Sequence, residues 1–566
     1  MNVSVQKKDD IRRAVILGAM DKQEDHDALL ALLEQTPEQA LELCFYDADA
    51  LPADLLAALS ARLDRGGRLK ILAYRALLAH TLSRLGLPAR QVSQQAAPAE
   101  PRAPLQAIAL AGSAQSLESI LRIVESLPLA DIAVFVAQHV QENQINLLDQ
   151  LLQTRTDYRV EMPQHMTRIE AGRLYVAPPG HHMKAAHGYV YLTRDRQIQF
   201  ARPSIDALFQ SLAGEYGPSL LAALLCGFGS DGVDGCAAIR AAGGCVIVQD
   251  GSECAPARVM PDAARDAGHY SLALKLPAIC SFAAAMAAGP AAKPEGDLLE
   301  LFLSALASHY GWDFRHYQRD SLQRRVVNLM GQFNLRVFAD FQRAVLTDTS
   351  QFERLAAELP VGVTSFFRHP PQLKLLREEV LPYLSSFPLI KLWSAGCSSG
   401  EEPYSLAIML EELALLDRSH VFATDLNPYL LELGASSLFP RDALALNRQN
   451  YLASGGERLF DAYLTDNGRF LRLADALRQR ILFYRHSLTD EGVFNEFQLI
   501  VCRNVLIYFD AELQRQVLRR FARSLHADGF LVLGPQDGLH RQALDSGFEP
   551  YRRGSSVYRL ARSAAA

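Results

Sequence analysis

No uninterrupted apolar run in the 566-residue sequence reaches the length that a membrane-spanning helix needs. The opening stretch, MNVSVQKKDDIRR, lacks the apolar core of a secretory signal peptide. The formal net charge is only −6, which does not suit a general nucleic-acid binder. These absences predict a cytoplasmic protein that neither inserts into a membrane nor binds nucleic acid.

Cysteine is scarce, with eight residues in the whole chain and no CxxC pair. The cysteines stand at positions 44, 226, 236, 245, 254, 280, 397 and 502. Such scattered cysteines are typical of buried thiols in a reducing compartment. The pattern therefore predicts neither a metal site nor a disulfide framework.

The length exceeds what one hydrophobic core supports and predicts three or four domains. Two stretches rich in Ala, Pro and Gly or Gln, at 90–104 and 289–297, read as linkers. The chain is predicted to be a multidomain α/β protein. Its expected parts are a small α/β module (1–95), a parallel-sheet α/β domain (105–288), a helical subdomain (296–382) and a Rossmann-like domain (383–566).

The first part has the pattern of a small α/β module. Its expected elements are strands at 14–17, 41–46 and 69–73 and helices at 27–33, 53–63 and 76–85. The second half, from CFYDADALPADLL to LSRLGL, resembles the STAS (anti-sigma-factor antagonist) fold. A degenerate response-regulator receiver is the alternative. Either resemblance implies a docking module for another signalling protein.

The second part places three chemically capable residues just past predicted strands. Ser113, His139 and Asp231 follow the apolar runs at 105–111, 132–137 and 220–225. In an open parallel sheet these strand ends share one edge, where ligands bind. A serine, a base and an acid are the parts of nucleophilic acyl transfer, although Ser and Asp are also common turn residues.

Around these residues the sequence resembles the CheB family of chemoreceptor glutamate methylesterases. The matching pieces are AGSA, VAQH, LYVAPPGHHM, RPSIDALFQSLA, CGFGSDGVDG and VMPDAA, in the family's order. The resemblance implies hydrolysis of a protein glutamyl methyl ester by a triad of Ser113, His139 and Asp231. Gln115 and Ser116 replace two glycines that the family carries after its serine, which puts the rate of this reaction in question.

The last part is organised around KLWSAGCSSGEEPYSLAIML, residues 391–410. A short apolar strand at 389–393 leads into a loop of small residues and then into a helix with Glu401 in its first turn. Asp425 ends the next predicted strand, where it can accept hydrogen bonds from ribose hydroxyls. Neither a P-loop lysine nor a GxGxxG fingerprint occurs, which favours a nucleoside ligand without pyrophosphate. S-adenosylmethionine is such a ligand.

From about 298 to 560 the sequence resembles the CheR family of chemoreceptor glutamate methyltransferases. TSFFR, WSAGCSSGEEPYS, ATDLN, VCRNVLIYFD and GFLVLG stand in the family's order. The resemblance implies that Arg368 and Tyr508 lie nearest the transferred methyl group. It also implies S-adenosylmethionine contacts from Thr364, Arg368, Glu401, Asp425, Leu488, Arg503 and Asn504.

Together the motifs predict a CheB–CheR fusion that methylates glutamates of the helical cytoplasmic domain of chemoreceptors and removes the same methyl groups. Two alternatives remain open at this point. In the first, the methyltransferase is active and the esterase-like domain is a catalytically impaired docking domain. In the second, the whole chain is an adaptor that binds S-adenosylmethionine without turnover.

Overall fold

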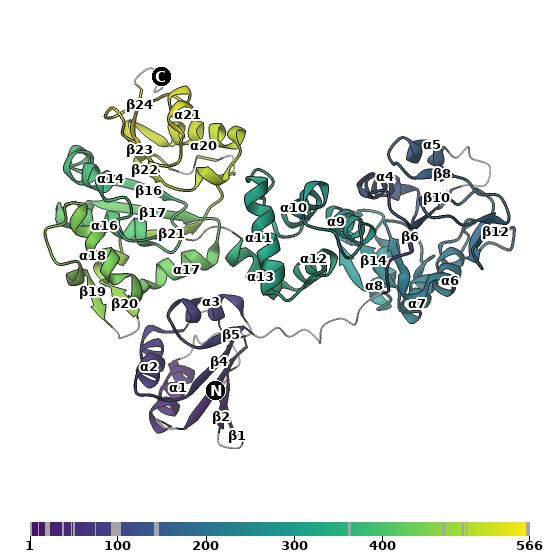
Figure 1. Ribbon diagram of the computed structural model, residues 1–566, viewed down its shortest axis with the longest axis horizontal. Helices are drawn as coiled ribbons and strands as arrows, with labels where there is room; N and C mark the ends of the chain where they lie inside the picture. Colours follow the sequence, from purple (N-terminus) through teal and green to yellow (C-terminus); the bar gives the residue numbers. More distant parts are fainter. Residues whose placement is uncertain are drawn as a thin grey trace. The chain divides into compact units, whose positions relative to one another are not determined.

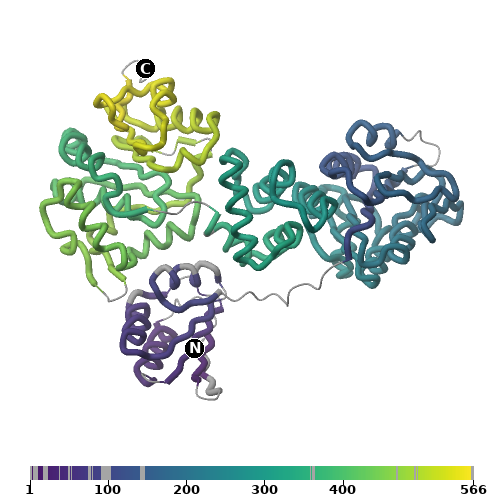
Figure 2. The backbone as a smooth tube through the Cα atoms, viewed as in Figure 1, coloured from purple at the N-terminus to yellow at the C-terminus, as the bar shows by residue number. Residues whose placement is uncertain are grey.

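The computed structural model places the chain in two compact units, and Figure 2 follows the backbone from the purple N-terminus to the yellow C-terminus. One unit comprises Met1–Gln95, His316–Leu322 and Ser350–Ala566, and the other comprises Ala96–Arg315 and Gln323–Thr349. The described residues are 3–8, 11–16, 23–36, 39–46, 48, 51–73, 75–91, 103–140, 147–359, 364–466, 470–489, 492–493 and 495–561.

The N-terminal module is a five-stranded sheet with the strand order β1-β2-β3-β4-β5. Its elements are β1 (Val3–Lys8), β2 (Ile11–Ile16), α1 (Gln23–Gln35), β3 (Ala40–Phe45), α2 (Ala53–Asp64), β4 (Leu69–Ala73), α3 (Ala76–Arg84) and β5 (Ala89–Gln91). Strand β1 is antiparallel to β2, and the other pairs are parallel. A receiver has the strand order 2-1-3-4-5, so the receiver alternative is wrong for this module. The STAS resemblance stays a prediction.

The second domain is built on a seven-stranded sheet with the order β15-β14-β13-β6-β7-β10-β8 (Figure 1). Every neighbouring pair is parallel. The strands are β6 (Ala107–Gly112), β7 (Ala133–Gln138), β8 (Arg159–Glu161), β10 (Arg173–Val176), β13 (Leu220–Leu224), β14 (Cys245–Gln249) and β15 (Leu272–Leu274). The chain builds outward from β6 in one direction and later resumes on its other side at β13. The direction in which the chain adds strands to the sheet therefore reverses between β6 and β13, although the strands themselves are parallel.

Helices cover this sheet because its strands are apolar on both faces. The helices of the domain are α4 (Leu117–Ser126), α5 (Leu148–Gln153), α6 (Ile205–Tyr216), α7 (Val233–Ala241), α8 (Val259–Asp266) and α9 (Leu276–Ala287). Phe135 of the sheet packs with Leu208 and Phe209 of α6 in one buried cluster. A small antiparallel sheet of β11 (His182–Ala186), β12 (Tyr189–Thr193) and β9 (Thr167–Arg168) completes the domain.

One disulfide joins Cys226 to Cys254, so the prediction that the scattered cysteines are buried thiols is wrong for these two. The two cysteines lie beyond the carboxyl ends of the neighbouring parallel strands β13 and β14, and their Cα atoms are 5.4 Å apart. A separation of 28 residues concealed this proximity, because the sequence does not show which strands are neighbours. The remaining cysteines are buried and free.

Helices dominate residues 296–384. They are α10 (Gly296–Tyr310), α11 (Arg319–Gln332), α12 (Phe338–Thr347), α13 (Thr349–Glu358), α14 (Pro370–Leu375) and α15 (Leu381–Leu384), with a π-turn at Leu376–Val380. The boundary between the compact units runs through this segment rather than at its ends. Within the described residues, no helix combines the length and apolar character needed to cross a membrane.

The last domain has a seven-stranded sheet with the order β21-β17-β16-β22-β23-β25-β24 (Figure 1). Its strands are β16 (Ile390–Ala395), β17 (Ser419–Asp425), β21 (Ile481–Arg485), β22 (Phe497–Cys502), β23 (Leu525–Leu533), β24 (Phe548–Pro550) and β25 (Val557–Leu560). The first five strands in this order are parallel, and β25 is antiparallel to both of its neighbours. The direction in which the chain adds strands reverses between the parallel strands β16 and β22. Open α/β sheets bind ligands at the carboxyl ends of the strands at such a point.

Two helices cover opposite faces of this sheet. Leu406 and Met409 of α16 (Glu401–Glu412) share a buried cluster with Leu392. Phe521 of α20 (Ala511–Ser524) shares another with Trp393. The other elements are α17 (Pro428–Ser436), α18 (Leu444–Ala453), α19 (Asp475–Arg478), α21 (His540–Asp545) and a small sheet of β18 (Leu438–Pro440), β20 (Phe470–Leu473) and β19 (Leu464–Asp466).

Candidate active sites

The predicted nucleophile, Ser113, is the first residue after β6 and the N-cap of a short 3-10 turn that leads into α4. Its amide donates to the carbonyl of Cys226 at 3.2 Å. A Cβ atom at Gly112 would lie 2.5 Å from Oγ of Ser116, so a glycine is required there. The Ser116 hydroxyl in turn donates to the Ser113 carbonyl at 2.7 Å. Ser116 therefore fixes the backbone of the nucleophile.

His139 and Asp231 form a close pair at the same edge, because they follow β7 and β13. Nε2 of His139 lies 2.8 Å from Oδ2 of Asp231. Asp231 also accepts hydrogen bonds from the amides of Ile205 (2.7 Å) and Asp206 (3.0 Å) and from the hydroxyl of Ser204 (2.8 Å). Burial raises the pKa of Asp231, but the hydrogen bonds from His139 and these amides outweigh it and lower the pKa. Asp231 is thus an anion fixed against His139.

A second buried carboxylate, Asp206, lies next to this pair. It accepts hydrogen bonds from the amides of Gly232 (2.9 Å) and Gly235 (2.7 Å). Burial, opposed by the Gly235 amide and assisted by the charge of Asp231, raises the pKa of Asp206 to about 6. The sequence analysis did not identify Asp206, although it stands in the quoted motif RPSIDALFQSLA. Its role in the geometry is to hold the loop that carries Asp231.

The structure brings the three predicted triad residues to one edge but divides their hydrogen bonds into two pairs. The hydroxyl of Ser113 donates to Oε1 of Gln115 at 2.5 Å. No hydrogen bond joins Ser113 to His139 among the bonds of the described residues. Gln115, one of the two predicted departures, therefore holds the hydroxyl that His139 must deprotonate.

A cavity of about 670 Å³ opens beside His139 and Asp231. Its volume is sufficient for a side chain with a small ester group. The lining residues are His139, Val140, Gln197, Gln199, Phe200, Ala201, Arg202, Phe228, Gly229, Ser230 and Asp231.

In the last domain, the loop after β16 depends on glycine. A Cβ atom at Gly396 (φ 77°) would lie 2.4 Å from Val505, and one at Gly400 (φ 97°) would lie 2.9 Å from Gly434. Ser398 between them has φ 52°, which is unfavourable for a serine. The loop therefore packs closely against Val505 and Gly434 at the carboxyl end of β16.

Asp425 ends β17 as predicted and holds this loop. Its Oδ2 accepts from the amide of Ser398 at 2.8 Å, and its Oδ1 accepts from the amide of Asn427 at 2.9 Å. Burial raises the pKa of Asp425, and the backbone hydrogen bonds partly offset that rise. The amide of Leu426 is a third backbone donor to this carboxylate, which has about four lone-pair sites, so the side chain can still accept a ribose hydroxyl.

Arg503 lies inside a buried ionic cluster. It forms an ion pair with Glu402 at 3.4 Å and donates to the carbonyl of Arg368 and to Nδ1 of His369 at 3.2 Å. Burial lowers the pKa of His369 to about 4, assisted by the charges of Arg503 and Arg368. His369 is thus a neutral acceptor. Arg503 positions the segment that carries Arg368.

Two carboxylates of this edge, the partly buried Glu402 and the buried Asp537, were not predicted as site residues. Glu402 accepts from the hydroxyl of Ser394 at 2.8 Å, and burial raises the pKa of Glu402 despite Arg503. Asp537 accepts from the amides of Asn504 (3.1 Å) and Gly534 (2.8 Å). The pair of acids at 401–402 was a usable signal, because successive helical residues point to different sides.

The remaining predicted cofactor residues lie around the same edge. The Oε2 atom of Glu401 accepts from Ser399 at 2.7 Å. The backbone carbonyl of Tyr508 accepts from the amide of Gln318 at 2.8 Å, while Leu488 is buried and Thr364 is partly buried. Non-glycine residues in the left-handed region also gather here. They are Phe367, His369, Ser398 and Asn504.

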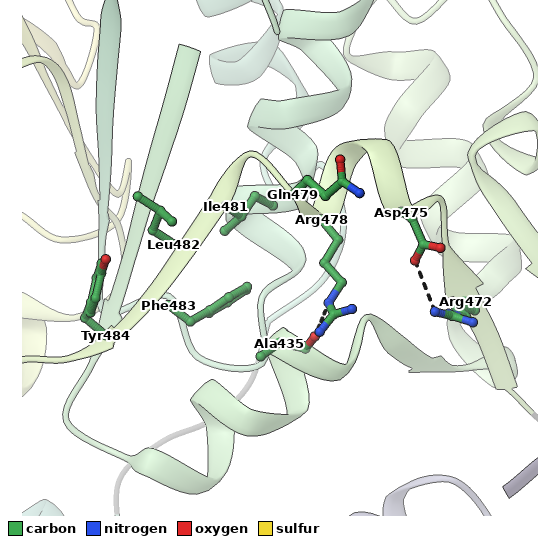
Figure 3. A pocket seen from close by; sticks show the side chains of 9 residues that line it. All are labelled: Ala435, Arg472, Asp475, Arg478, Gln479, Ile481, Leu482, Phe483 and Tyr484. Carbon is green, nitrogen blue, oxygen red and sulfur yellow. Dashed lines mark hydrogen bonds and ion pairs between the residues drawn. The ribbon is translucent and has the colours of Figure 1, made fainter. Parts of the chain in front are cut away.

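A cavity of about 550 Å³ in the last domain lies at its outer strand β21 (Figure 3). Arg478 donates to the carbonyl of Ala435 at 2.8 Å, and Arg472 pairs with Asp475 at 3.0 Å. None of the predicted cofactor residues lines this cavity. It is therefore separate from the edge formed by β16, β17 and β22.

Models of three families match successive parts of the chain. They are CheB methylesterase at residues 108–282, the all-alpha domain of CheR methyltransferase at 297–359 and the S-adenosylmethionine-binding domain of CheR methyltransferase at 362–551. A putative methyltransferase, Cher3 of Pseudomonas putida, is 38% identical over 261 residues, which cover 46% of this chain and 96% of that protein. The chain belongs to the CheR methyltransferase family.

Another relative agrees with the assignment of the CheR part, while the CheB part is assigned from its family model. The chemotaxis protein methyltransferase of Listeria monocytogenes is 32% identical over 240 residues, which cover 42% of this chain and 88% of that protein. Among solved structures, the CheB methylesterase catalytic domain of Thermotoga maritima is 24% identical, covers 31% of this chain and 94% of that chain, and has a TM-score of 0.29. The cofactor of the CheR part is S-adenosylmethionine.

The described residues fit this cofactor. At this edge, three buried acceptor oxygens have no hydrogen-bond partner among the described residues. They are Oγ of Ser398, Oδ1 of Asn504 and Oδ1 of Asp537. Such atoms are costly to bury unless a ligand completes them, and the ribose hydroxyls and ammonium group of S-adenosylmethionine supply the matching donors.

Proposed function

We propose that the chain methylates glutamate side chains in the helical cytoplasmic domain of chemoreceptors and hydrolyses the same methyl esters. The main support is that each matched domain has a candidate site at the carboxyl ends of two neighbouring strands, between which the strand order of its sheet reverses. Chemoreceptors as substrates follow from the chemotaxis methyltransferases among the relatives. With these substrates, the protein works in the cytoplasm. Its N-terminal module is proposed to bind a further signalling protein.

In the methyltransferase reaction the chain's residues position groups and do not transfer protons. Bound S-adenosylmethionine supplies an activated methyl group. The acceptor carboxylate has a pKa near 4.3 and is an anion at neutral pH, so it needs no general base. Arg368 is proposed to hold this carboxylate and Tyr508 to orient it. The buried pair of Arg503 and Glu402 fixes the Arg368 segment, and such orientation can contribute several kcal/mol.

In the esterase reaction, Ser113 Oγ attacks the ester carbonyl after its hydrogen bond to Gln115 breaks. His139 takes the hydroxyl proton, and Asp231 stabilises the imidazolium. When the C–OCH₃ bond breaks, the proton passes from His139 to the leaving methoxide, so methanol departs. Water then attacks the acyl-enzyme with His139 as base, which restores Ser113 and releases the glutamate. The Gln115 hydrogen bond adds a cost to the first step.

The test is methyl transfer from labelled S-adenosylmethionine to receptor cytoplasmic domains, followed by measurement of released methanol. Labelled receptor with methanol release supports both activities. Label without methanol identifies the CheB domain as a docking domain, and S-adenosylmethionine binding without label identifies an adaptor. Tyr508→Phe is expected to lower the transfer rate more than it lowers cofactor affinity. Equal losses would make Tyr508 a cofactor-binding residue.

A further inference from the structure

A two-residue turn at the rim of the esterase cavity carries an unusually exposed aromatic side chain. Phe200 is 96% exposed and, with Gln199, connects Ile198 to Ala201. Two backbone hydrogen bonds close the turn, from the Ile198 amide to the Ala201 carbonyl (3.2 Å) and from the Ala201 amide to the Ile198 carbonyl (2.8 Å). The ring thus lies at the tip of a tight hairpin.

Both residues of this turn have a backbone conformation that their side chains disfavour. The φ angles are 46° for Gln199 and 64° for Phe200. Two-residue turns with positive φ at both positions favour Asn-Gly or Asp-Gly. A single exposed apolar residue is ordinary, as Leu459 shows with 78% exposure at φ −79°. An exposed ring held on a strained turn indicates a functional position.

The turn is tied to the catalytic acid. Oε1 of Gln199 accepts from the hydroxyl of Ser230 at 2.5 Å, and Nε2 of Gln199 donates to Asp206 at 3.3 Å. Ser230 immediately precedes Asp231, and the amide of Asp206 donates to Asp231 at 3.0 Å. The position of Phe200 relative to the catalytic acid is therefore set by hydrogen bonds.

Phe200 shares the esterase cavity with a second exposed ring. Phe228, which is 48% exposed, lines the same cavity as His139 and Asp231. The cavity thus offers an apolar surface next to His139 and Asp231, the proposed base and acid. Aromatic side chains are the commonest anchors of protein interfaces because they bury a large area with few rotatable bonds.

We propose that Phe200, together with Phe228, binds the apolar stripe of the amphipathic helix that presents the glutamyl methyl ester to Ser113. The inference rests on the proposed esterase function and adds how its substrate is recognised. Residues three or four apart lie on one face of a helix, with their Cβ atoms about 5–6 Å apart. An apolar side chain one turn from the ester therefore contacts the rings while the ester enters the cavity.

The test compares the full-length protein with its Phe200→Gly variant, using methanol release from methylated receptor domain. Glycine suits this position of the turn, so the variant keeps the hairpin and removes only the ring. The KM for the receptor domain is expected to rise about tenfold, while kcat changes by less than about twofold. Phe200→Leu retains an apolar side chain, so its KM is expected to lie between those of the wild type and Phe200→Gly.

Met166→Gly is the matched control. Met166 is 47% exposed, has φ 65° and does not line the cavity, so its replacement is expected to leave KM unchanged. On the substrate side, alanine in place of the apolar residue one turn from the ester should raise the KM of the wild type. It should add little to the KM of Phe200→Gly, because the contact is already lost.

Hydrolysis of a small ester, N-acetylglutamate γ-methyl ester, distinguishes the two levels of inference. If the wild type hydrolyses receptor and small ester and Phe200→Gly keeps the wild-type KM for receptor, the docking role is wrong and the esterase stands. If the wild type hydrolyses neither ester, the esterase function is wrong and the docking role fails with it. An equal loss on both esters would also overturn the docking role, because the small ester has no helix.

Discussion

The two catalytic centres occupy equivalent places in their sheets but hold their polar groups differently. In the CheB domain the proposed nucleophile Ser113 is bonded to the exposed side chain of Gln115, while the proposed base His139 is bonded to Asp231. In the CheR domain the charged groups are buried and bonded to one another, as Arg503 is to Glu402. Acyl transfer moves a proton between side chains, so its groups must exchange partners. Methyl transfer to a carboxylate moves none, so its groups can be permanently fixed.

The strongest test of this difference is Ser113→Ala. Methanol release should fall by at least about 10³-fold, because the acyl-enzyme can no longer form. Methyl transfer measured on the same preparation should stay at the wild-type rate. Ser126→Ala is the control, since Ser126 ends the helix α4 that follows Ser113 and donates to the carbonyl of Ile123 (2.7 Å). Methanol release equal to that of the wild type would exclude Ser113 as the nucleophile.

Asp425→Ala tests the CheR centre, whose groups are held by fixed hydrogen bonds. The variant loses the acceptors for the amides of Ser398 and Asn427 and for the ribose hydroxyls. Hydrogen bonds of this kind contribute about 1–3 kcal/mol, so calorimetry should show a ten- to hundredfold weaker affinity for S-adenosylmethionine. Asp417→Ala is the control, because the fully exposed Asp417 pairs only with Arg480 (3.2 Å) among the described residues. An unchanged affinity in Asp425→Ala would contradict the ribose contact.

Gln115→Gly should bring the esterase centre closer to a working triad. It frees the Ser113 hydroxyl from a hydrogen bond of about 1.4 kcal/mol, so methanol release should rise about tenfold. Gln115→Glu retains an acceptor at the same place and should stay slow. If both variants hydrolyse at the wild-type rate, the hydrogen bond to Gln115 does not limit the reaction.

His369 supplies an expected effect on stability that depends on pH. Its folded pKa of about 4 lies below the value near 6.5 expected in the unfolded chain. Between these values the unfolded state binds the proton and the folded state does not, so stability falls as pH drops from about 6.5 to 4. His369→Gln should lose less stability than the wild type over this window, as measured by urea denaturation at each pH. Parallel curves would show that His369 does not contribute.

The positions of the main site residues could be predicted from the sequence because these residues follow strand ends. The apolar runs before Ser113, His139, Asp231 and Asp425 define strands, and parallel strands bring their carboxyl ends to one edge. The structure places all four residues there. Predicted strand bounds differ from the observed ones by a few residues, because strand ends depend on tertiary pairing.

The partners of individual side chains could not be predicted. The hydrogen bond from Ser113 to Gln115, the disulfide from Cys226 to Cys254 and the ion pair of Glu402 all depend on side-chain direction and on which strands are neighbours. The strain at Phe200 was also hidden, because no rule of composition or periodicity assigns a positive φ to phenylalanine.

The joining of both enzymatic parts in one polypeptide has a consequence for receptor methylation. Every molecule carries one centre of each kind, so a change in expression cannot alter their ratio. The methylation level at steady state then depends on the rate constants and substrate concentrations alone, and each full cycle consumes one S-adenosylmethionine. If the hydrogen bond from Ser113 to Gln115 slows the esterase centre as proposed, it shifts the balance point of that cycle toward methylated receptor.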